Sequence, residues 1–320
     1  MFATRLPPRV VPGWASRIAL WVIHRDRQGS PSYHDGMTTP TTAATHRGTL
    51  ADAVEVLRGR RLAVLTGAGV STDSGIPDYR GPDSPPRTPM TYQQFAGDPV
   101  FRRVYWARNH VGWRHVHDTR PNDGHRALAR MERDGVVSGV ITQNVDLLHE
   151  EAGSRTVIDL HGRYDRVVCL NCGRVVSRAH LAERLEALNP HFLEGLDGSV
   201  VDIEIAPDAD AVIEDTSGFV PADCESCGGI LKPDIVYFGE VVPRERADRA
   251  LALVDRSQGL LVAGSSLTVQ SGLRIVRRAV ADDLPIVIVN RGETRGDRFA
   301  TVKVDAGTTQ TLVGLAEALG

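Results

Sequence analysis

The chain has 320 residues, enough for about two domains. Its 37 Lys and Arg residues nearly balance its 40 Asp and Glu residues, and the formal net charge is −3. This balance argues against a protein that neutralises phosphates over a broad surface, so we expect no nucleic-acid partner. No apolar run reaches the roughly 18 residues that a membrane-spanning helix needs, so we expect no membrane partner either.

The four cysteines form two pairs, Cys169 with Cys172 and Cys224 with Cys227, each with the spacing Cys-x-x-Cys. Two such pairs in a long chain without other cysteines are typical of a closed, structural zinc site with four thiolate ligands. A disulfide framework would be typical of a short, cysteine-rich secreted domain instead. The apolar run at 18–23 is too short for a secretory signal peptide. We therefore expect a reducing compartment and a cytoplasmic location.

Residues 1–47 differ from the rest of the chain in composition. They contain six Arg and two Asp with scattered Pro, Ser and Thr, and they show no sustained hydrophobic period. We expect a disordered or weakly ordered N-terminal extension. One hypothesis is that Met37 is the true start of the protein. The alternative is that the extension is an Arg-rich targeting segment.

Order is predicted from about residue 48, where Thr49 followed by Asp52 indicates the start of a helix. Short, nearly continuous apolar runs predict buried strands at 61–66, 136–142, 259–263 and 285–289. Helical patterns lie between the strands, as at 244–255 and 273–281. This alternation predicts an α/β fold with a doubly wound, Rossmann-like parallel sheet.

Small or hydrogen-bonding residues follow four of the predicted strands. They are Gly67-Ala68-Gly69, Gln143-Asn144-Val145-Asp146, Gly264-Ser265-Ser266 and Asn290-Arg291-Gly292. In open α/β sheets the ligand lies beyond the carboxyl ends of the strands, so we predict that these four ends share one crevice.

The first of these ends begins a dinucleotide-binding fingerprint, since glycines let a backbone approach a pyrophosphate closely. Thr72 stands where the third glycine of that fingerprint belongs, and no acidic residue follows as a ribose clamp. These departures disfavour a hydride-transferring dehydrogenase. They leave a nucleotide site and a purely structural tight turn as alternatives.

Residues 164–235 interrupt the alternation and contain both cysteine pairs. We predict that they form a smaller zinc-binding domain inserted into a Rossmann-like domain made of 48–163 and 236–320. A zinc ribbon that binds nucleic acid is the competing interpretation. It lacks support because the stretch 189–223 is rich in acidic residues and has no Lys or Arg.

Several motifs together resemble those of the sirtuins, the NAD-dependent protein deacylases. The first is Gly67-Ala68-Gly69-Val70-Ser71-Thr72-Asp73-Ser74-Gly75-Ile76-Pro77-Asp78-Tyr79-Arg80. The segments 142–149, 161–162, 232–240 and 264–267 follow in the family's order, and the resemblance covers about residues 48–320. Tyr105-Trp106-Ala107-Arg108-Asn109 with Val111-Gly112-Trp113 resembles the class II branch, which includes the lipoamidase-type mitochondrial sirtuin of animals.

The resemblance implies an enzyme that cleaves the nicotinamide–ribose bond of NAD and transfers the acyl group of an acyl-lysine protein or peptide to ADP-ribose. NAD is then a consumed co-substrate, and one Zn²⁺ is structural. The products are nicotinamide, deacylated lysine and O-acyl-ADP-ribose. By similarity, the acyl oxygen attacks the anomeric carbon, and the general base then takes a proton from the nicotinamide ribose.

The resemblance also implies roles for single residues. His161 is the implied base, and its usual pKa near 6.5 suits proton transfer at neutral pH. Asn144 and Asp146 are implied to hold the nicotinamide ribose and carboxamide. The implied NAD contacts are Gly67, Ala68, Gly69, Ser71, Thr72, Gly75, Ile76, Pro77, Asp78, Tyr79, Arg80, Gln143, Asn144, Val145, Asp146, Gly264, Ser265, Ser266, Asn290, Arg291 and Gly292. His149 belongs to one of the motifs and is interpreted as structural.

In the family the acyl-lysine peptide adds as a strand between the segments that correspond to 236–240 and 267–271. Val236, Phe238, Gly239 and Glu240 are the implied substrate contacts. Gln270-Ser271 departs from the family pattern, because many sirtuins have Pro there.

Tyr105 and Arg108 share one face of a predicted helix. They resemble a Tyr-x-x-Arg pair that binds an acidic acyl chain in desuccinylating sirtuins, and an Arg fork suits a carboxylate. We hypothesise a preference for longer or acidic acyl groups over acetyl. The alternative is a pair on the helix surface with a neighbouring salt bridge.

Two other functions are compatible with the same residues. One is protein mono-ADP-ribosyl transfer, and the other is a non-catalytic module that senses NAD or ADP-ribose. The sequence identifies neither the protein target nor the acyl chain nor the oligomeric state, and it does not reveal whether residues 1–36 belong to the native protein.

Overall fold

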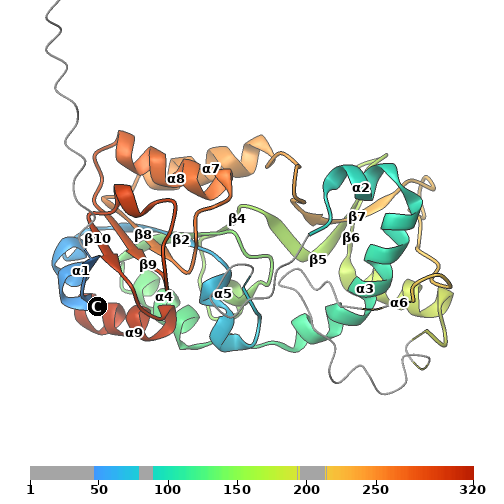
Figure 1. The fold of residues 1–320 in the computed structure, drawn as a ribbon, viewed down its shortest axis with the longest axis horizontal. Coiled ribbons are helices and arrows are strands. Elements are labelled where there is room, and N and C mark those ends of the chain that lie inside the picture. Colours follow the sequence, from blue (N-terminus) through green and yellow to red (C-terminus); the bar gives the residue numbers. More distant parts are fainter. Residues whose placement is uncertain (1–46, 79–88, 193, 195–212, 214) are drawn as a thin grey trace, which may run out of the picture. The chain divides into compact units, whose positions relative to one another are not determined.

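The computed structural model describes residues 47–78, 89–192, 194, 213 and 215–320. The predicted N-terminal extension, apart from its last residue, and the predicted site residues Tyr79 and Arg80 lie outside this range. The described residues form a seven-stranded sheet and a three-stranded sheet (Figure 1). Among them, no helix combines the length and the apolar character needed to cross a membrane.

The larger sheet has the strand order β1-β10-β9-β8-β2-β3-β4, and all of its neighbouring strands pair in parallel. Its strands are β1 (Arg47–Gly48), β2 (Leu62–Thr66), β3 (Val137–Thr142), β4 (Val157–Asp159), β8 (Gly259–Ala263), β9 (Ile286–Val289) and β10 (Val302–Val304). Every residue of β2, β8 and β9 is buried, as expected for strands that are covered on both faces. The predicted doubly wound parallel sheet is confirmed.

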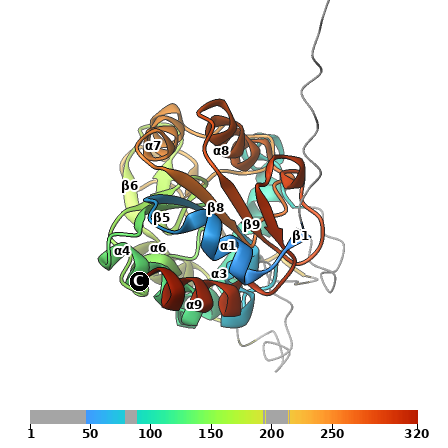
Figure 2. The ribbon, with the colours of Figure 1, turned by 90° about the vertical axis from the view of Figure 1, so that its left-hand side faces the viewer.

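Helices cover the two faces of this sheet (Figure 2). One face packs against α1 (Leu50–Leu57), α4 (Asp123–Arg133) and α9 (Thr308–Leu319). The other packs against α7 (Arg244–Asp255) and α8 (Gln270–Ala281), and α8 begins three residues before the predicted start at 273. The short helix α5 (Leu148–Glu151) follows β3. The predicted start of α1 is confirmed, because Thr49 and Asp52 form a capping box.

The smaller sheet is antiparallel and has the order β6-β5-β7. It contains β5 (Gly162–Cys169), β6 (Val175–Ser177) and β7 (Leu231–Ile235), and α6 (Arg178–Leu188) follows β6. A second hydrophobic core joins this sheet to α2 (Tyr92–Gly97) and α3 (Pro99–Asp118). Two stretches of chain therefore build this core, because α2 and α3 precede the proposed insertion 164–235.

The tryptophans of α3 explain part of the aromatic motif at 105–113. The indole N–H of Trp106 donates to the carbonyl of Leu231 in β7, at 3.3 Å. The guanidinium of the buried Arg178 lies 5.0 Å from the centre of the Trp113 ring and donates to the side chain of Asn109, at 3.0 Å. These contacts hold α3 against the smaller sheet and α6. The aromatic residues of the motif at 105–113 therefore serve, at least in part, to pack this helix.

The chain crosses from the larger sheet to the smaller one at Gly162. Its φ is +87°, in the left-handed region that glycine adopts most easily. A Cβ atom at this position would lie 1.9 Å from the carbonyl oxygen of Asp234. Both the backbone angle and the space therefore require glycine.

We expect Gly162→Ala to destabilise the protein more than Gly153→Ala. Gly153 also has a positive φ of +100°, but a Cβ there meets no atom within 4 Å, so this control isolates the backbone strain. Forcing a methyl group into the occupied space at Gly162 adds about 1–3 kcal/mol. Chemical denaturation measures both free energies of unfolding. Equal losses for the two variants would contradict the predicted clash.

Candidate active site

A cavity of about 960 Å³ lies where the carboxyl ends of β2, β3, β8 and β9 meet. The predicted residues that line it are Gly67, Ala68, Gly69, Ser71, Thr72, Ile76, Pro77, Asp78, Gln143, Asn144, Val145, Asp146, His161, Val236, Phe238, Gly239, Glu240, Gly264, Ser265, Ser266, Asn290, Arg291 and Gly292. All four predicted strand ends contribute to this wall, which confirms the single shared crevice.

Two strand ends touch through their backbones. The N–H of Gly69 donates to the carbonyl of Gly264, at 2.9 Å. Gly264 has a φ of +65°, and a Cβ there would lie 2.5 Å from the nitrogen of Val70. On the other side, the hydroxyl of Thr308 donates to the carbonyl of Gly69, at 2.7 Å. The glycine loop after β2 is thus fixed between the end of β8 and the start of α9.

Ser71 connects this loop to the end of β3. Its buried hydroxyl donates to a carboxylate oxygen of Asp146, at 2.7 Å, and accepts from the amide of Asn144, at 3.0 Å. Burial raises the pKa of the Asp146 carboxyl, while the hydrogen bonds from Ser71 and from the N–H of Leu148 act in the opposite direction. A carboxyl and a carboxamide lie side by side here, and they offer the donors and acceptors that a ligand carboxamide needs.

Two buried histidines stand behind this network. His149 shares a hydrogen bond of 2.9 Å with the hydroxyl of Thr66, and its ring centre lies 4.8 Å from that of His125. Burial lowers the pKa of His125 to about 4 and that of His149 well below its usual value. Neither histidine is among the described residues that line the cavity. This position agrees with the structural interpretation of His149.

His161 lines the cavity between the carboxyl end of β3 and the first turn of α8. Its Nδ1 lies 3.1 Å from the carbonyl oxygen of Gln143, and its Nε2 lies 2.7 Å from the hydroxyl of Ser271. Burial lowers the pKa of His161 to about 4, while the hydrogen bond to Gln143 acts in the opposite direction. The imidazole is therefore neutral at pH 7 and able to take a proton.

The segment after β7 forms another part of the wall. The N–H of Val236 donates to the carbonyl of His161, at 2.8 Å, and the N–H of Tyr237 donates to the carboxylate of Glu240, at 2.9 Å. The same carboxylate lies 3.1 Å from the ammonium group of the buried Lys232. These contacts hold the predicted substrate segment 236–240 in place.

Three described residues of the predicted site are not part of the cavity wall: Gly75, Tyr105 and Arg108. Tyr105 is 2% exposed and packs against the rings of Phe95, Trp106 and Tyr237. Tyr237 lines the cavity, so Tyr105 lies one ring behind the wall. Tyr105 belongs to the second core, whereas Arg108, one turn further along α3, is half-buried.

Arg274 and Thr308 also line the cavity and are not among the predicted site residues, and Ser271 lines it within the predicted peptide segment 267–271 without a predicted role of its own. In the sequence, Ser271 stands out only as a departure from the family's peptide-binding pattern. A hydroxyl in place of Pro at the start of α8 is the signal that would have pointed to its contact with His161.

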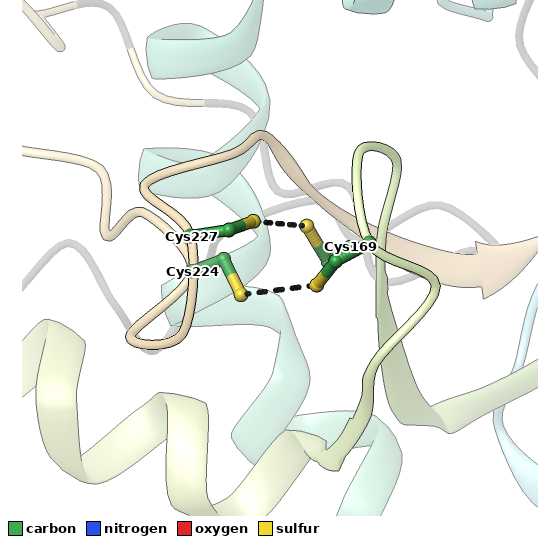
Figure 3. A group of neighbouring side chains, drawn as sticks. Cys169, Cys224 and Cys227 are labelled. Carbon is green, nitrogen blue, oxygen red and sulfur yellow. Dashed lines mark hydrogen bonds between the residues drawn. The ribbon is translucent and has the colours of Figure 1, made fainter.

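The four cysteine sulfurs lie within 4.8 Å of one another. Figure 3 shows Cys224 and Cys227, on the loop before β7, facing Cys169 at the end of β5. The sulfur of Cys169 lies 3.6 Å from that of Cys227, and the sulfur of Cys172 lies 3.8 Å from that of Cys224. A tetrahedral zinc with bonds of about 2.3 Å separates its sulfurs by about 3.8 Å, so the four side chains fit a zinc ion.

The environment favours the deprotonated form that a metal requires at two of these thiols, Cys224 and Cys227. At Cys172 the N–H of Arg174 also lowers the pKa, but the contacts with Cys227 and Cys169 outweigh it and raise the pKa to about 11. The side-chain amide of Asn171 donates to the sulfur of Cys227, at 3.5 Å, and lowers the pKa of that thiol to about 6. All four cysteines are free of disulfide bonds. Four protein ligands leave a tetrahedral ion no open position, which indicates a structural rather than a catalytic metal.

Comparison with known proteins agrees with the fold and the cavity. The Sir2 family model matches residues 67–271. NAD-dependent protein deacetylase 1 of Mycobacterium avium (strain 104) is 65% identical over 268 residues, which are 84% of this chain and 95% of the relative. NAD-dependent protein deacylase SIR4 of Monosiga brevicollis is 47% identical and covers 76% of this chain, with 79% of its own length matched.

Solved Sir2 structures share the fold. A complex of Sir2 with a p53 peptide and NAD⁺ is 30% identical with a TM-score of 0.63, covering 83% of this chain and 96% of its own. A complex of a Sir2 homologue with NAD has a TM-score of 0.65 and 30% identity, covering 86% of this chain and 95% of its own. The parallel sheet, the crevice at its strand ends and the cysteine cluster thus define a Rossmann-like protein with a zinc module. The chain belongs to the Sir2 family.

We expect the purified protein to contain one zinc ion per chain and Cys172→Ala to lose it, because three thiolates leave the ion without its fourth protein ligand. The variant should also unfold at a lower temperature, since the binding free energy of a structural zinc contributes to folding. Elemental mass spectrometry and thermal unfolding measure the two effects.

Ser226→Ala is the control, because Ser226 lies on the other cysteine loop, between the two ligands Cys224 and Cys227, and is not a thiol. It should retain the metal. A Cys172→Ala protein with full zinc content would show that the four thiols do not act as one site.

Proposed function

We propose that this chain is an NAD-dependent protein lysine deacetylase or deacylase. In this reaction the nicotinamide–ribose bond of NAD breaks, and the acyl group of an acyl-lysine passes to ADP-ribose. Nicotinamide, deacylated lysine and O-acyl-ADP-ribose are the products. Relatives that are 65% and 50% identical are named NAD-dependent protein deacetylases, which supports this activity.

The observation that carries the proposal is the position of His161. It is a neutral imidazole in the wall of a cavity that the glycine loop and the polar end of β3 also line. A base must be neutral to accept a proton, and it must be within reach of the group that gives it up. His161 is neutral, and its place in the cavity wall would bring it within reach of a ribose bound there, so we assign it as the general base that deprotonates the nicotinamide ribose.

We assign the other residues by their places in the wall. Asn144 and Asp146 would bind the nicotinamide end, because their carboxamide and carboxyl groups lie together at the end of β3. The glycine loop and the ends of β8 and β9 would bind the phosphates and the adenosine. The acyl-lysine peptide would pair between 236–240 and 267–271, both of which line the cavity.

The cysteine cluster would hold a Zn²⁺ ion that stabilises the smaller sheet. It takes no part in the chemistry we propose, because the four thiols fill a tetrahedral coordination shell. The class II branch, the cytoplasmic location and the expected absence of nucleic-acid and membrane partners stay predictions.

We expect His161→Ala to lower the rate of deacylation by about 10²–10⁴-fold, since this is what a positioned general base contributes. Mass spectrometry of reactions with NAD and acyl-lysine peptides measures deacylated peptide and O-acyl-ADP-ribose together. His191→Ala is the control, because that imidazole is 83% exposed and lies outside the cavity. It should react like the unmodified protein.

The same products separate the competing functions. ADP-ribosylated protein without free deacylated lysine would identify a mono-ADP-ribosyltransferase. Binding of NAD without turnover would identify a sensing module. A panel of acetyl-, succinyl- and methylglutaryl-lysine peptides also addresses the acyl preference, and tenfold faster turnover of the acetyl peptide would remove the hypothesis based on Tyr105 and Arg108.

The pKa of His161 predicts the dependence of kcat/KM on pH. The active form is the neutral imidazole, which exists above the pKa, so activity is lost as the pH falls through that value. With a pKa of about 4, kcat/KM should stay level as far as His161 is concerned between pH 8 and pH 6. Steady-state kinetics test this, with circular dichroism at each pH to show that the fold persists. An apparent pKa of 6.5 or above for a catalytic base would contradict the prediction.

A further inference from the structure

Both ring nitrogens of His161 have a partner that the chain itself supplies. Nδ1 faces the main-chain carbonyl of Gln143, at 3.1 Å, and Nε2 faces the hydroxyl of Ser271, at 2.7 Å. The two partners come from different parts of the fold, since Gln143 follows β3 and Ser271 lies in the first turn of α8. The imidazole is therefore held between two elements.

The chemistry of the partners fixes the tautomer. A carbonyl oxygen only accepts hydrogen bonds, so Nδ1 must carry the proton. In the neutral ring Nε2 then carries the lone pair, and the hydroxyl of Ser271 is the donor. The lone pair with which the proposed base would take up a proton is therefore on Nε2, the nitrogen that the Ser271 hydroxyl contacts.

Ser271 sits on a well-supported frame. Its neighbour Gly272 has no side chain, and a Cβ there would lie 2.7 Å from the side-chain oxygen of Gln143. The side chain of Gln143 also donates to the hydroxyl of Ser265, at 2.7 Å, and to the carbonyl of Thr66, at 3.2 Å. The start of α8 thus packs directly on Gln143, whose carbonyl accepts the hydrogen bond from Nδ1–H of His161.

We propose that Ser271 is a positioning residue for the base His161. Its hydroxyl holds the imidazole in the Nδ1–H tautomer, so that Nε2 is the nitrogen that carries the lone pair at the cavity wall. This inference rests on the proposed function. Ser271 differs here from the Pro that the resemblance leads one to expect, and a Pro has no hydroxyl to donate.

The hydroxyl suits both protonation states of the base. Nε2 has a single lone pair, so the Ser271 hydroxyl turns away from it when the ribose hydroxyl binds. The ribose O–H bond then breaks, its electron pair stays on the ribose oxygen, and the proton forms a bond to Nε2. The imidazolium then has donors on both nitrogens. Ser271 can turn its hydroxyl and accept from Nε2–H, because a hydroxyl both donates and accepts.

The test separates two steps of the reaction. Nicotinamide leaves before the base acts, so the reverse of that step returns labelled nicotinamide to NAD and does not require His161. We expect Ser271→Ala to lower deacylation roughly fivefold, the usual effect of losing one hydrogen bond. Exchange of labelled nicotinamide should stay within about twofold of the unmodified protein, because the effect acts through the later step.

Two further variants make the readout specific. Ser271→Thr keeps the hydroxyl and should restore deacylation. Ser266→Ala removes another hydroxyl from the cavity wall and should raise the KM for NAD without changing the ratio of exchange to deacylation. Thermal unfolding of each variant shows whether it is folded.

Several outcomes would overturn the inference. One is a Ser271→Ala protein that deacylates as fast as the unmodified protein. Another is equal loss of exchange and deacylation, which indicates a merely structural role, and a third is failure of Ser271→Thr to restore the rate. These results differ from failure of the proposed function, in which the unmodified protein itself forms no deacylated peptide from NAD and acyl-lysine.

Discussion

The close contact between Gly69 and Gly264 is the constraint on which the rest of the site depends. A hydrogen bond of 2.9 Å joins the two backbones, and a Cβ at Gly264 would lie 2.5 Å from the nitrogen of Val70. Larger residues would push the loop after β2 away from the end of β8. The loop would then lose Ser71 as the link to Asn144 and Asp146, which lie at the end of the next strand. One backbone contact therefore aligns three strand ends around the cavity.

Burial then sets the charges within this frame. His125 and His149 are neutral because burial penalises the imidazolium, and the hydrogen bonds of Ser71 act against the rise that burial causes in the pKa of Asp146. His161 is neutral for the same reason as the other two histidines, yet it faces the cavity. Desolvation thus keeps His161, the base that we propose, neutral at pH 7, and it also lowers the affinity of this imidazole for a proton.

The features that were predictable from the sequence were those with local causes. The buried strands, the helix cap at Thr49 and the polar strand ends can each be recognised from a few neighbouring residues. The same holds for the cysteine pairs, because the spacing Cys-x-x-Cys is itself typical of a zinc site. Tyr105 shows the limit, because helical spacing places its ring on one face of a helix without revealing that the second core covers it. The contact of His161 with Ser271 joins residues 110 positions apart, and only the packing of α8 onto Gln143 brings them together. Such contacts depend on tertiary structure and leave no periodic signal.

The position of His161 also links the two sheets physically. Along the chain, His161 lies between β4, an edge strand of the larger sheet, and β5. Strand β5 ends at Cys169, one of the four clustered thiols. β5 pairs with β7, and directly after β7 the N–H of Val236 donates to the carbonyl of His161, at 2.8 Å. An ion that holds Cys169 to Cys227 would therefore fix the strand pair that supports the backbone of the base, although it lies outside the cavity. Such an ion would be connected mechanically to the proposed base without taking any part in the chemistry.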